Sequence, residues 1–241
     1  MNRRVIAILF LVAASLGASA ARAAVVHSND AGGQDGFVYA FSKVPSAVSA
    51  GFEVIPAGQA PVSGDSHTTE AYVQFGLGSI GLTGGQVTSA TLSLYLENAS
   101  TVGFGVNPSA GQPITVDVYP VSAAWSRATI KWSNKPANGS LITSSTPIAG
   151  IDAWVDFDVT STVVDWLNNP LTNFGLVLKG SVPVGSSPDW VYANFSSGFG
   201  TLGHAPTLTV VPEPGSIVLA LCGLPLLAWQ ARRRWTRRAQ A

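Results

Sequence analysis

The 241-residue chain is short of cysteine, histidine and basic residues, and each shortage excludes a class of protein. Its one cysteine, Cys222, lies in an apolar run near the C-terminus, so residues 24–211 form no disulfide and are stabilised by their core. The histidines, His27, His67 and His204, are widely separated, and none has the second ligand at the spacing that a zinc site requires. We therefore expect no metal site of this type and no cofactor.

Basic residues are scarce between the two ends of the chain. Residues 24–211 hold five of them against twelve acidic residues, a net charge of −7 for this part. The five are Lys43, Arg127, Lys131, Lys135 and Lys179. Nucleic-acid binding depends on Lys and Arg side chains that neutralise phosphates, so we exclude it as a function. An anionic polysaccharide is also a poor electrostatic match unless a divalent cation bridges it to the protein.

The N-terminus has the three parts of a secretory signal peptide. Arg3 and Arg4 form a basic start, and residues 5–16 form a continuous apolar stretch. Ala21-Arg22-Ala23 then fits the A-x-A cleavage pattern, with residues 18–20 as a second such site. We expect residues 1–23 to direct export.

The C-terminal residues 212–241 also divide into three parts. Pro212-Glu213-Pro214 precedes an apolar run at 215–229, which is shorter than the ~20 residues that cross a bilayer comfortably. Five arginines follow the run: Arg232, Arg233, Arg234, Arg237 and Arg238. The positive-inside rule assigns that basic end to the cytoplasm.

This order of motif, apolar run and basic tail resembles the PEP-CTERM sorting signal of Gram-negative bacteria. The resemblance implies that an exosortase, a membrane-embedded sorting protease, recognises the tail and cleaves near residues 212–214. The protein would then be anchored in the inner membrane only transiently, through 215–229, before delivery to the cell envelope or extracellular matrix. A permanent C-terminal membrane anchor is the alternative.

Between the ends, alternation of apolar and polar residues predicts an all-β fold, an antiparallel β-sandwich of jelly-roll type. Strands are expected at 36–41, 70–77, 87–97, 113–121, 129–132, 153–159, 173–179, 190–195 and 207–211. Thr160–Asn168 has helical spacing and predicts a short helix with Thr160 as N-cap. Lys43–Thr69 shows the least pattern and is expected to be a long loop or insertion.

Two sequence blocks carry a second resemblance. The first consists of Trp125, Thr129, Trp132 and Pro136; the second of Asp158, Val159, Thr160, Val164, Trp166, Asn173, Gly175 and Leu176. Together they resemble the DNRLRE domain family, which is grouped with carbohydrate-binding modules found beside polysaccharide-degrading domains. The acid that this family places after its Phe-x-Ser motif is missing here, at Gly198. The resemblance implies a domain over 24–211 that is non-catalytic and structural or glycan-binding, with extracellular polysaccharide as its partner.

Exposed aromatic rings are the predicted glycan contacts, because they bury the apolar C–H face of a sugar ring. Trp154, Trp190 and Tyr192 are expected on exposed faces and are the candidate glycan-binding residues. The core is the expected place for the remaining motif tryptophans, which are Trp125, Trp132 and Trp166.

Asp152, Asp156 and Asp158 form the strongest acidic cluster of the chain. Asp156 and Asp158 would lie about 7 Å apart on one strand face, a spacing that the carboxyl pairs of glycosidases allow. The alternative function is therefore a secreted polysaccharide hydrolase or lyase that uses this cluster. Calcium binding by the same acids is also left open. Asp158 is equally well placed to cap the helix that follows it, and we expect no catalytic residue.

Overall fold

The computed structural model describes residues 22–41, 53–62, 65–99, 105–182 and 191–213. The predicted apolar stretches of both ends, the arginine cluster and Trp190 lie outside these residues. Residues 24–210 form one compact unit, within which the fold is described; of the second unit only 22–23 and 211–213 are described. Across the described ranges, no helix has the length and apolar character needed to span a membrane.

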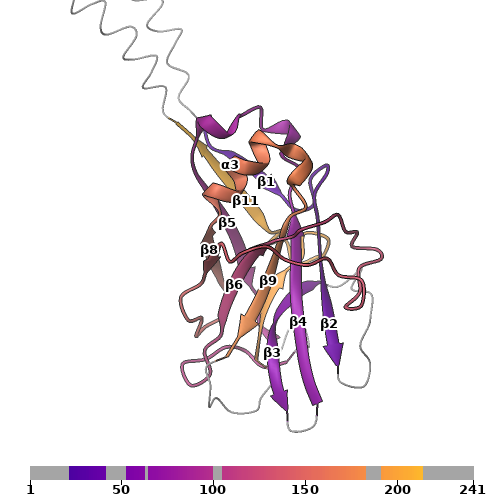
Figure 1. The fold of residues 1–241 in the computed structure, drawn as a ribbon. Helices are drawn as coiled ribbons and strands as arrows, with labels where there is room; N and C mark the ends of the chain where they lie inside the picture. The colour runs from indigo at the N-terminus through magenta and orange to yellow at the C-terminus, as the bar shows by residue number, and fades with distance from the viewer. Residues whose placement is uncertain (1–21, 42–52, 63–64, 100–104, 183–190, 214–241) are drawn as a thin grey trace, which may run out of the picture. The chain divides into compact units, whose positions relative to one another are not determined.

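Antiparallel strands make up most of the fold, as Figure 1 shows. They are β1 (Ala24–His27), β2 (Gln34–Phe41), β3 (Val54–Val62), β4 (Asp65–Gln74), β5 (Val87–Leu96), β6 (Thr115–Pro120), β7 (Thr143–Ser144), β8 (Ala153–Asp158), β9 (Leu176–Ser181), β10 (Val191–Ser196) and β11 (Thr207–Pro212). Short 3₁₀ turns occupy Leu77–Ser79, Gly84–Gln86 and Pro170–Thr172, and helix α3 spans Thr160–Asn168. The predicted all-β class and the predicted helix are confirmed.

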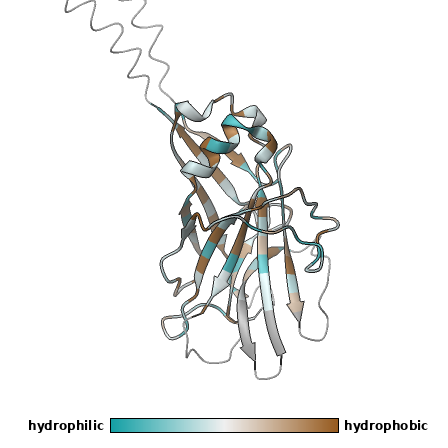
Figure 2. Ribbon diagram, viewed as in Figure 1, coloured by the Kyte–Doolittle hydropathy of each residue, from teal (hydrophilic) through white to brown (hydrophobic). Residues whose placement is uncertain are grey.

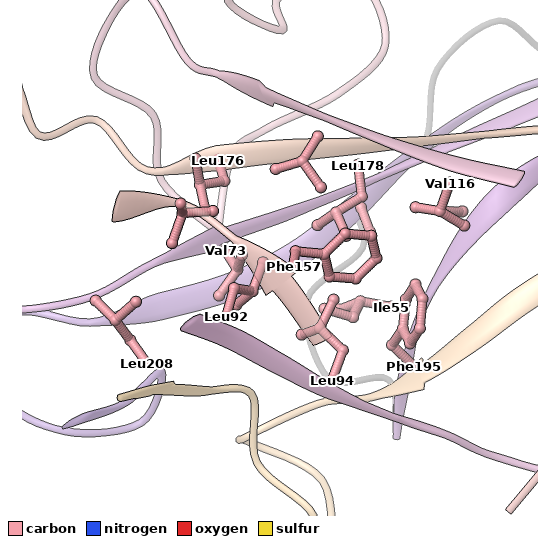
Figure 3. Close-up of a cluster of buried hydrophobic side chains, with 14 of the residues drawn as sticks. Ile55, Val73, Leu92, Leu94, Val116, Phe157, Leu176, Leu178, Phe195 and Leu208 are labelled. Carbon is pink, nitrogen blue, oxygen red and sulfur yellow. The ribbon is translucent and has the colours of Figure 1, made fainter. Parts of the chain in front are cut away.

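The strands form one continuous sheet that folds back on itself into two layers. One layer contains β2, β4, β9, β6 and β7, and the other contains β8, β5, β11 and β1, while β3 and β10 connect them. Polar and apolar residues alternate along the strands (Figure 2). Leu92 of β5, Phe157 of β8 and Leu178 of β9 therefore meet in one buried core (Figure 3). This arrangement is consistent with the predicted sandwich; its jelly-roll type stays a prediction.

Strand β4 is where the sheet forks. Along one edge it pairs with β2, and along the other it pairs with β3 through residue 69 and then with β9 over residues 70–73. Two glycines, Gly58 of β3 and Gly180 of β9, permit the close approach that the fork requires. A Cβ atom on Gly180 would lie only 2.7 Å from the Cα of Gly58. A side chain at position 180 would therefore force β9 away from β3, whereas one at position 58 would clash with Val191 and Tyr192 of β10.

Residues 121–142, the covering segment, lie over the outer face of β4 and β9 and cross in front of them in Figure 1. The ring of Trp125 meets that of Tyr72 edge-on at a centroid distance of 5.4 Å. Its indole N–H donates to the carbonyl oxygen of Phe174 at 2.8 Å, and Ile130 is buried beside them in a second apolar cluster. Both faces of β4 and β9 are consequently buried over residues 70–73 and 176–178.

Two expectations about strands are wrong. Residues 129–132 are irregular, with turns at either end, because Ile130 and Trp132 of the covering segment pack onto the second cluster instead of pairing in the sheet. From Val54 on, the loop expected over Lys43–Thr69 is instead strand β3 and the start of β4. The Gly and Pro residues of β3 have low β-propensity, but its pairing with both β4 and β10 overrides that preference.

Candidate functional site, an open aromatic face

The outer faces of the two layers differ in what covers them. The covering segment buries the outer side of β4 and β9, whereas the outward residues of β5 and β8 reach solvent. We call the outer surface of β5 and β8 the open face. Along β5 the leucines point into the core and the residues between them, including Ser93 and Tyr95, are half-buried on the outer side. On β8 the predicted outward residues Trp154, Asp156 and Asp158 are all exposed. The alternation of apolar and polar residues therefore predicts correctly which side chains of β5 and β8 face outward.

Three aromatic rings meet on the open face and form what we call the aromatic platform: Tyr95, Trp154 and His204. Tyr95 and Trp154 stand directly opposite each other in the β5–β8 register, and their rings meet edge-on at 5.3 Å. The His204 ring stacks on Tyr95 at 3.9 Å and meets Trp154 edge-on at 6.1 Å. Trp154 still leaves 48% of its surface exposed. The platform thus offers a large ring, held by its neighbours and open to a ligand.

A buried carboxylate fixes the position of the His204 ring. Its Nδ1 atom lies 3.1 Å from Oε1 of Glu97, and the hydroxyl of Ser196 donates to the same oxygen. Glu97 is itself buried at the end of β5, so its contact holds His204 against the sheet. Sequence reasoning missed His204 and Tyr95 as site residues. The alternation that places Tyr95 outward could have identified it, but no local signal brings the loop of His204 to β5.

The acidic cluster borders the platform along β8. Asp156 accepts a hydrogen bond on Oδ1 from the hydroxyl of Ser93 at 2.6 Å. Asp158 accepts two on Oδ1, from the backbone N–H of Thr160 at 2.9 Å and from its hydroxyl at 2.6 Å. These two bonds lower the pKa of Asp158 below its ordinary value, with the side-chain bond as the larger cause. A catalytic proton donor needs the opposite shift, so Asp158 suits a structural role at the start of α3.

That role differs in detail from the predicted one. Thr160 is not the N-cap of α3 but its first residue, and Val159 occupies the N-cap position without a side-chain capping bond. The carboxylate of Asp158 satisfies the free N–H of Thr160 instead. Beside it, a hollow of about 370 Å³ is lined by Ile142, Thr143, Asp158, Thr160 and Ser161.

The other predicted aromatic contacts differ in outcome. Tyr192 is buried, with 2% of its surface exposed, so the expectation that its ring lies on an open face is wrong. The reason is that β10 pairs with β3 and β5 and is buried along its whole length. Burial also raises the pKa of Tyr192 to about 12. Of the motif tryptophans, Trp166 is in the main core, and Trp125 and Trp132 pack on the second cluster, as predicted.

Charge is divided between the two sides of the sandwich. The basic residues described between 24 and 210 are Arg127, Lys131, Lys135 and Lys179. The first three belong to the covering segment. Two of the four contact the same carboxylate oxygen of Glu70 on β4: the Nζ atom of Lys135 lies 2.5 Å from it, and that of Lys179 lies 3.3 Å from it. Strands β5 and β8 contain no basic residue. The open face is therefore acidic and aromatic, and the covered side holds the positive charge.

In the described part of the chain, no group of three or more His, Cys, Asp or Glu side chains could hold a metal ion.

A family model of known proteins matches this chain. The family model named carbohydrate-binding module family 96 matches residues 57–193, more than half of the chain. These residues include β5, β8 and most of the open face. No curated protein matches the chain.

Proposed function

The chain belongs to carbohydrate-binding module family 96, and from this premise we propose that its open face binds a glycan through the ring of Trp154. Carbohydrate-binding modules are typically non-catalytic and commonly extracellular, which agrees with the function predicted from the sequence. The proposed protein is thus a glycan-binding or structural component outside the cell, without hydrolytic activity of its own.

The exposure of Trp154 is the observation that carries this proposal. A tryptophan side chain buries a large apolar area when it can, yet this ring stays about half exposed on a regular strand. The Trp154 ring meets the rings of Tyr95 and His204 edge-on. These contacts fix the orientation of the ring before a ligand binds. A preorganised ring loses little conformational entropy on binding, and this favours stacking against a sugar ring.

Replacing Trp154 by alanine tests the proposal. We expect Trp154→Ala to weaken binding to a retained polysaccharide by at least about tenfold, equivalent to 1.4 kcal/mol, without changing the urea midpoint appreciably. Leu171→Ala is the matched control, because Leu171 is 85% exposed and lies in the turn after α3. Affinity electrophoresis in gels containing a panel of polysaccharides measures the effect. Equal retention of both variants on every glycan would contradict a binding role for Trp154.

The same panel tests the alternative, a hydrolase or lyase acting through Asp152, Asp156 and Asp158. Release of reducing ends or unsaturated products by the wild-type protein, lost in Asp156→Ala, would overturn the non-catalytic proposal. We expect no turnover, because Asp158 already serves the start of α3 and Asp156 is held by Ser93.

We further propose that residues 1–23 export the chain and that residues 212–241 are a sorting signal for an exosortase. The supporting features are the Pro212-Glu213-Pro214 motif, the apolar run 215–229 and the arginine cluster after it. Mass spectrometry of the protein recovered from its source cells is the test. We expect a chain that begins near Ala24 and ends near the motif, whereas an intact tail would show a permanent anchor.

A further inference from the structure

We propose that Lys179 and Asn138 become joined by an isopeptide bond, a covalent amide between the amine of one side chain and the carboxamide carbon of the other, with Glu70 carrying the proton. The bond fastens the covering segment to β9. Its site lies on the covered side of the sandwich and involves no residue of the aromatic platform, so it does not depend on the proposed function.

Three separate elements bring the reacting groups together. Lys179 lies on β9, between β4 and β6, and Glu70 of β4 stands directly opposite it in the register. Asn138 belongs to the covering segment and forms an isolated antiparallel bridge with Val121. The fold therefore unites Asn138 and Lys179, which are 41 positions apart in the chain, beside the carboxylate of Glu70.

The amine and the carboxamide are already in contact. The Nζ atom of Lys179 donates a hydrogen bond to Oδ1 of Asn138 at 2.7 Å. A C=O bond is about 1.2 Å long, so the Cγ atom that Nζ would attack lies within about 4 Å of it. Reacting atoms approach to about 3–3.5 Å before a bond forms. A small rotation of either side chain completes that approach.

Glu70 is placed to exchange protons with the amine. Its Oε1 atom lies 3.3 Å from Nζ of Lys179, close to the distance of about 2.6–3.2 Å at which side chains transfer protons. The carboxylate is buried, and its other oxygen accepts the hydroxyl hydrogen of Tyr72 at 3.1 Å. Because water has little access to it, the proton passes between the side chains themselves.

Lys135 adds a second positive charge to the same carboxylate. Its Nζ atom lies 2.5 Å from Oε1 of Glu70 and 3.7 Å from the centroid of the Trp132 ring. Burial lowers the pKa of Lys135, and the charge of Lys179 contributes to the shift while Glu70 opposes it. This pocket therefore disfavours two ammonium ions side by side, and a lysine amine is nucleophilic only without its extra proton. Of the two lysines, Lys179 is the one in contact with an amide.

The reaction balances without a further reactant. The ammonium group of Lys179 gives a proton to Glu70, and the neutral Nζ attacks Cγ of Asn138. In the tetrahedral intermediate, Oδ1 carries the negative charge and Nζ carries a surplus proton. Glu70 delivers its proton to Nδ2 and accepts the surplus one from Nζ. The Cγ–Nδ2 bond then breaks, and ammonia leaves with that last proton as ammonium, so Glu70 is a carboxylate again and nothing is oxidised or reduced.

Asn138 has a second route to the loss of ammonia, because Gly139 follows it. The backbone nitrogen of a residue after asparagine can attack the same Cγ atom and close a cyclic imide. Here the N–H of Gly139 donates to the carbonyl oxygen of Pro120 at 2.8 Å, which engages that nitrogen in the fold. The two products have the same mass, but only the isopeptide bond requires Lys179.

The link adds to the domain a covalent constraint that cysteine cannot provide, since residues 24–211 contain none. It closes the chain between 138 and 179 into a loop that includes β7, β8 and α3. A cross-link of this kind restricts the unfolded chain as a disulfide does. We therefore expect the Tm of the wild-type protein to exceed that of Lys179→Arg by about 5–15 °C.

Mass spectrometry of the full-length chain, expressed and purified, tests the proposal. We expect the denatured protein to be lighter by one ammonia than the mass calculated from its identified ends. An endoprotease that cleaves before aspartate then separates the two partners, because Asp152 and Asp165 lie between them. The peptide with Asn138 and the peptide with Lys179 should be recovered as one branched species.

Variants assign the roles. Lys179→Arg retains the charge but cannot form the amide, and Glu70→Gln retains the shape of the proton carrier without its chemistry, so neither should contain the branched species. Lys135→Arg is the matched control: it changes the other lysine on Glu70 and should keep the link. Circular dichroism checks that each variant is folded, and Lys179→Arg keeps the test decisive if Glu70→Gln is not.

Each contrary result has a definite meaning. An undiminished mass and two separate peptides in the wild-type protein would overturn the proposal. A loss of ammonia that persists in Lys179→Arg would identify the cyclic imide and overturn it as well. A branched species formed at the wild-type yield in folded Glu70→Gln would contradict the role given to Glu70.

Discussion

At the scale of single residues, Trp154 and Tyr192 show what alternation can and cannot predict. Both are aromatic residues of short strands, and both were expected on exposed faces. Trp154 lies on β8, whose outer side is open, and it is about half exposed. Tyr192 lies on β10, which neighbouring strands enclose, and it is buried. Alternation within a strand predicts which side a residue faces, but coverage of that side depends on segments distant in sequence.

The burial of Tyr192 predicts a loss of stability in alkali. Its pKa is raised from 10 in the unfolded chain to about 12 in the fold. Below about pH 10 the phenol keeps its proton in both states and the stabilisation is complete. Between the two values only the unfolded chain releases the proton, so the free energy of unfolding falls as pH rises, by up to about 2–3 kcal/mol at full ionisation.

Urea unfolding at a series of pH values from about 9 to about 12 measures this loss, with tyrosinate absorbance recorded in parallel. Tyr192→Phe should flatten the decline, although not fully, because burial and Glu70 also raise the pKa of Tyr72. Tyr95→Phe is the control, on the open face. The interpretation fails if the decline has the same slope in wild type and Tyr192→Phe.

At the scale of elements, strong local patterns were predictable and sheet pairing was not. The leucine alternation of β5, the Val–Phe alternation of β8 and the helical spacing of α3 each identified an element from a few residues. Strand β3 was missed because it contains Pro and Gly and becomes a strand only through β4 and β10. The open face could be predicted as two separate strands, but their pairing and the position of His204 could not.

The fork between β3 and β9 predicts a position that tolerates only glycine. Gly180→Ala would place a methyl group 2.7 Å from backbone atoms of Ala57 and Gly58, and we expect it to destabilise the domain by about 1–3 kcal/mol. Gly150→Ala is the control, because no atom lies within 4 Å of its added Cβ, and its effect should stay within about 0.5 kcal/mol. Equal urea midpoints for the two variants would contradict the close approach at the fork.

At the scale of the whole molecule, the sequence predicts the sign of the charge but not its distribution. The net charge of −7 for residues 24–211 excluded nucleic acid as a partner. Only the path of the covering segment reveals that Arg127, Lys131 and Lys135 share one side with Lys179. A protein with evenly mixed charges would present the same charge on every side. This domain instead presents its basic residues on the covered side and acidic residues on the open face.

The pairing of the first strand with the last determines how the domain responds to a pulling force. Ala24 of β1 stands opposite Val210 of β11, and the two strands run antiparallel. The chain therefore enters and leaves the domain at the same end of one strand pair. A force that pulls the two ends of the domain apart loads the Ala24–Val210 pair first and then separates the register pairs of β1 and β11 one after another. Under such a force the domain would lengthen by releasing β1 while the sheet that carries the aromatic platform remained closed.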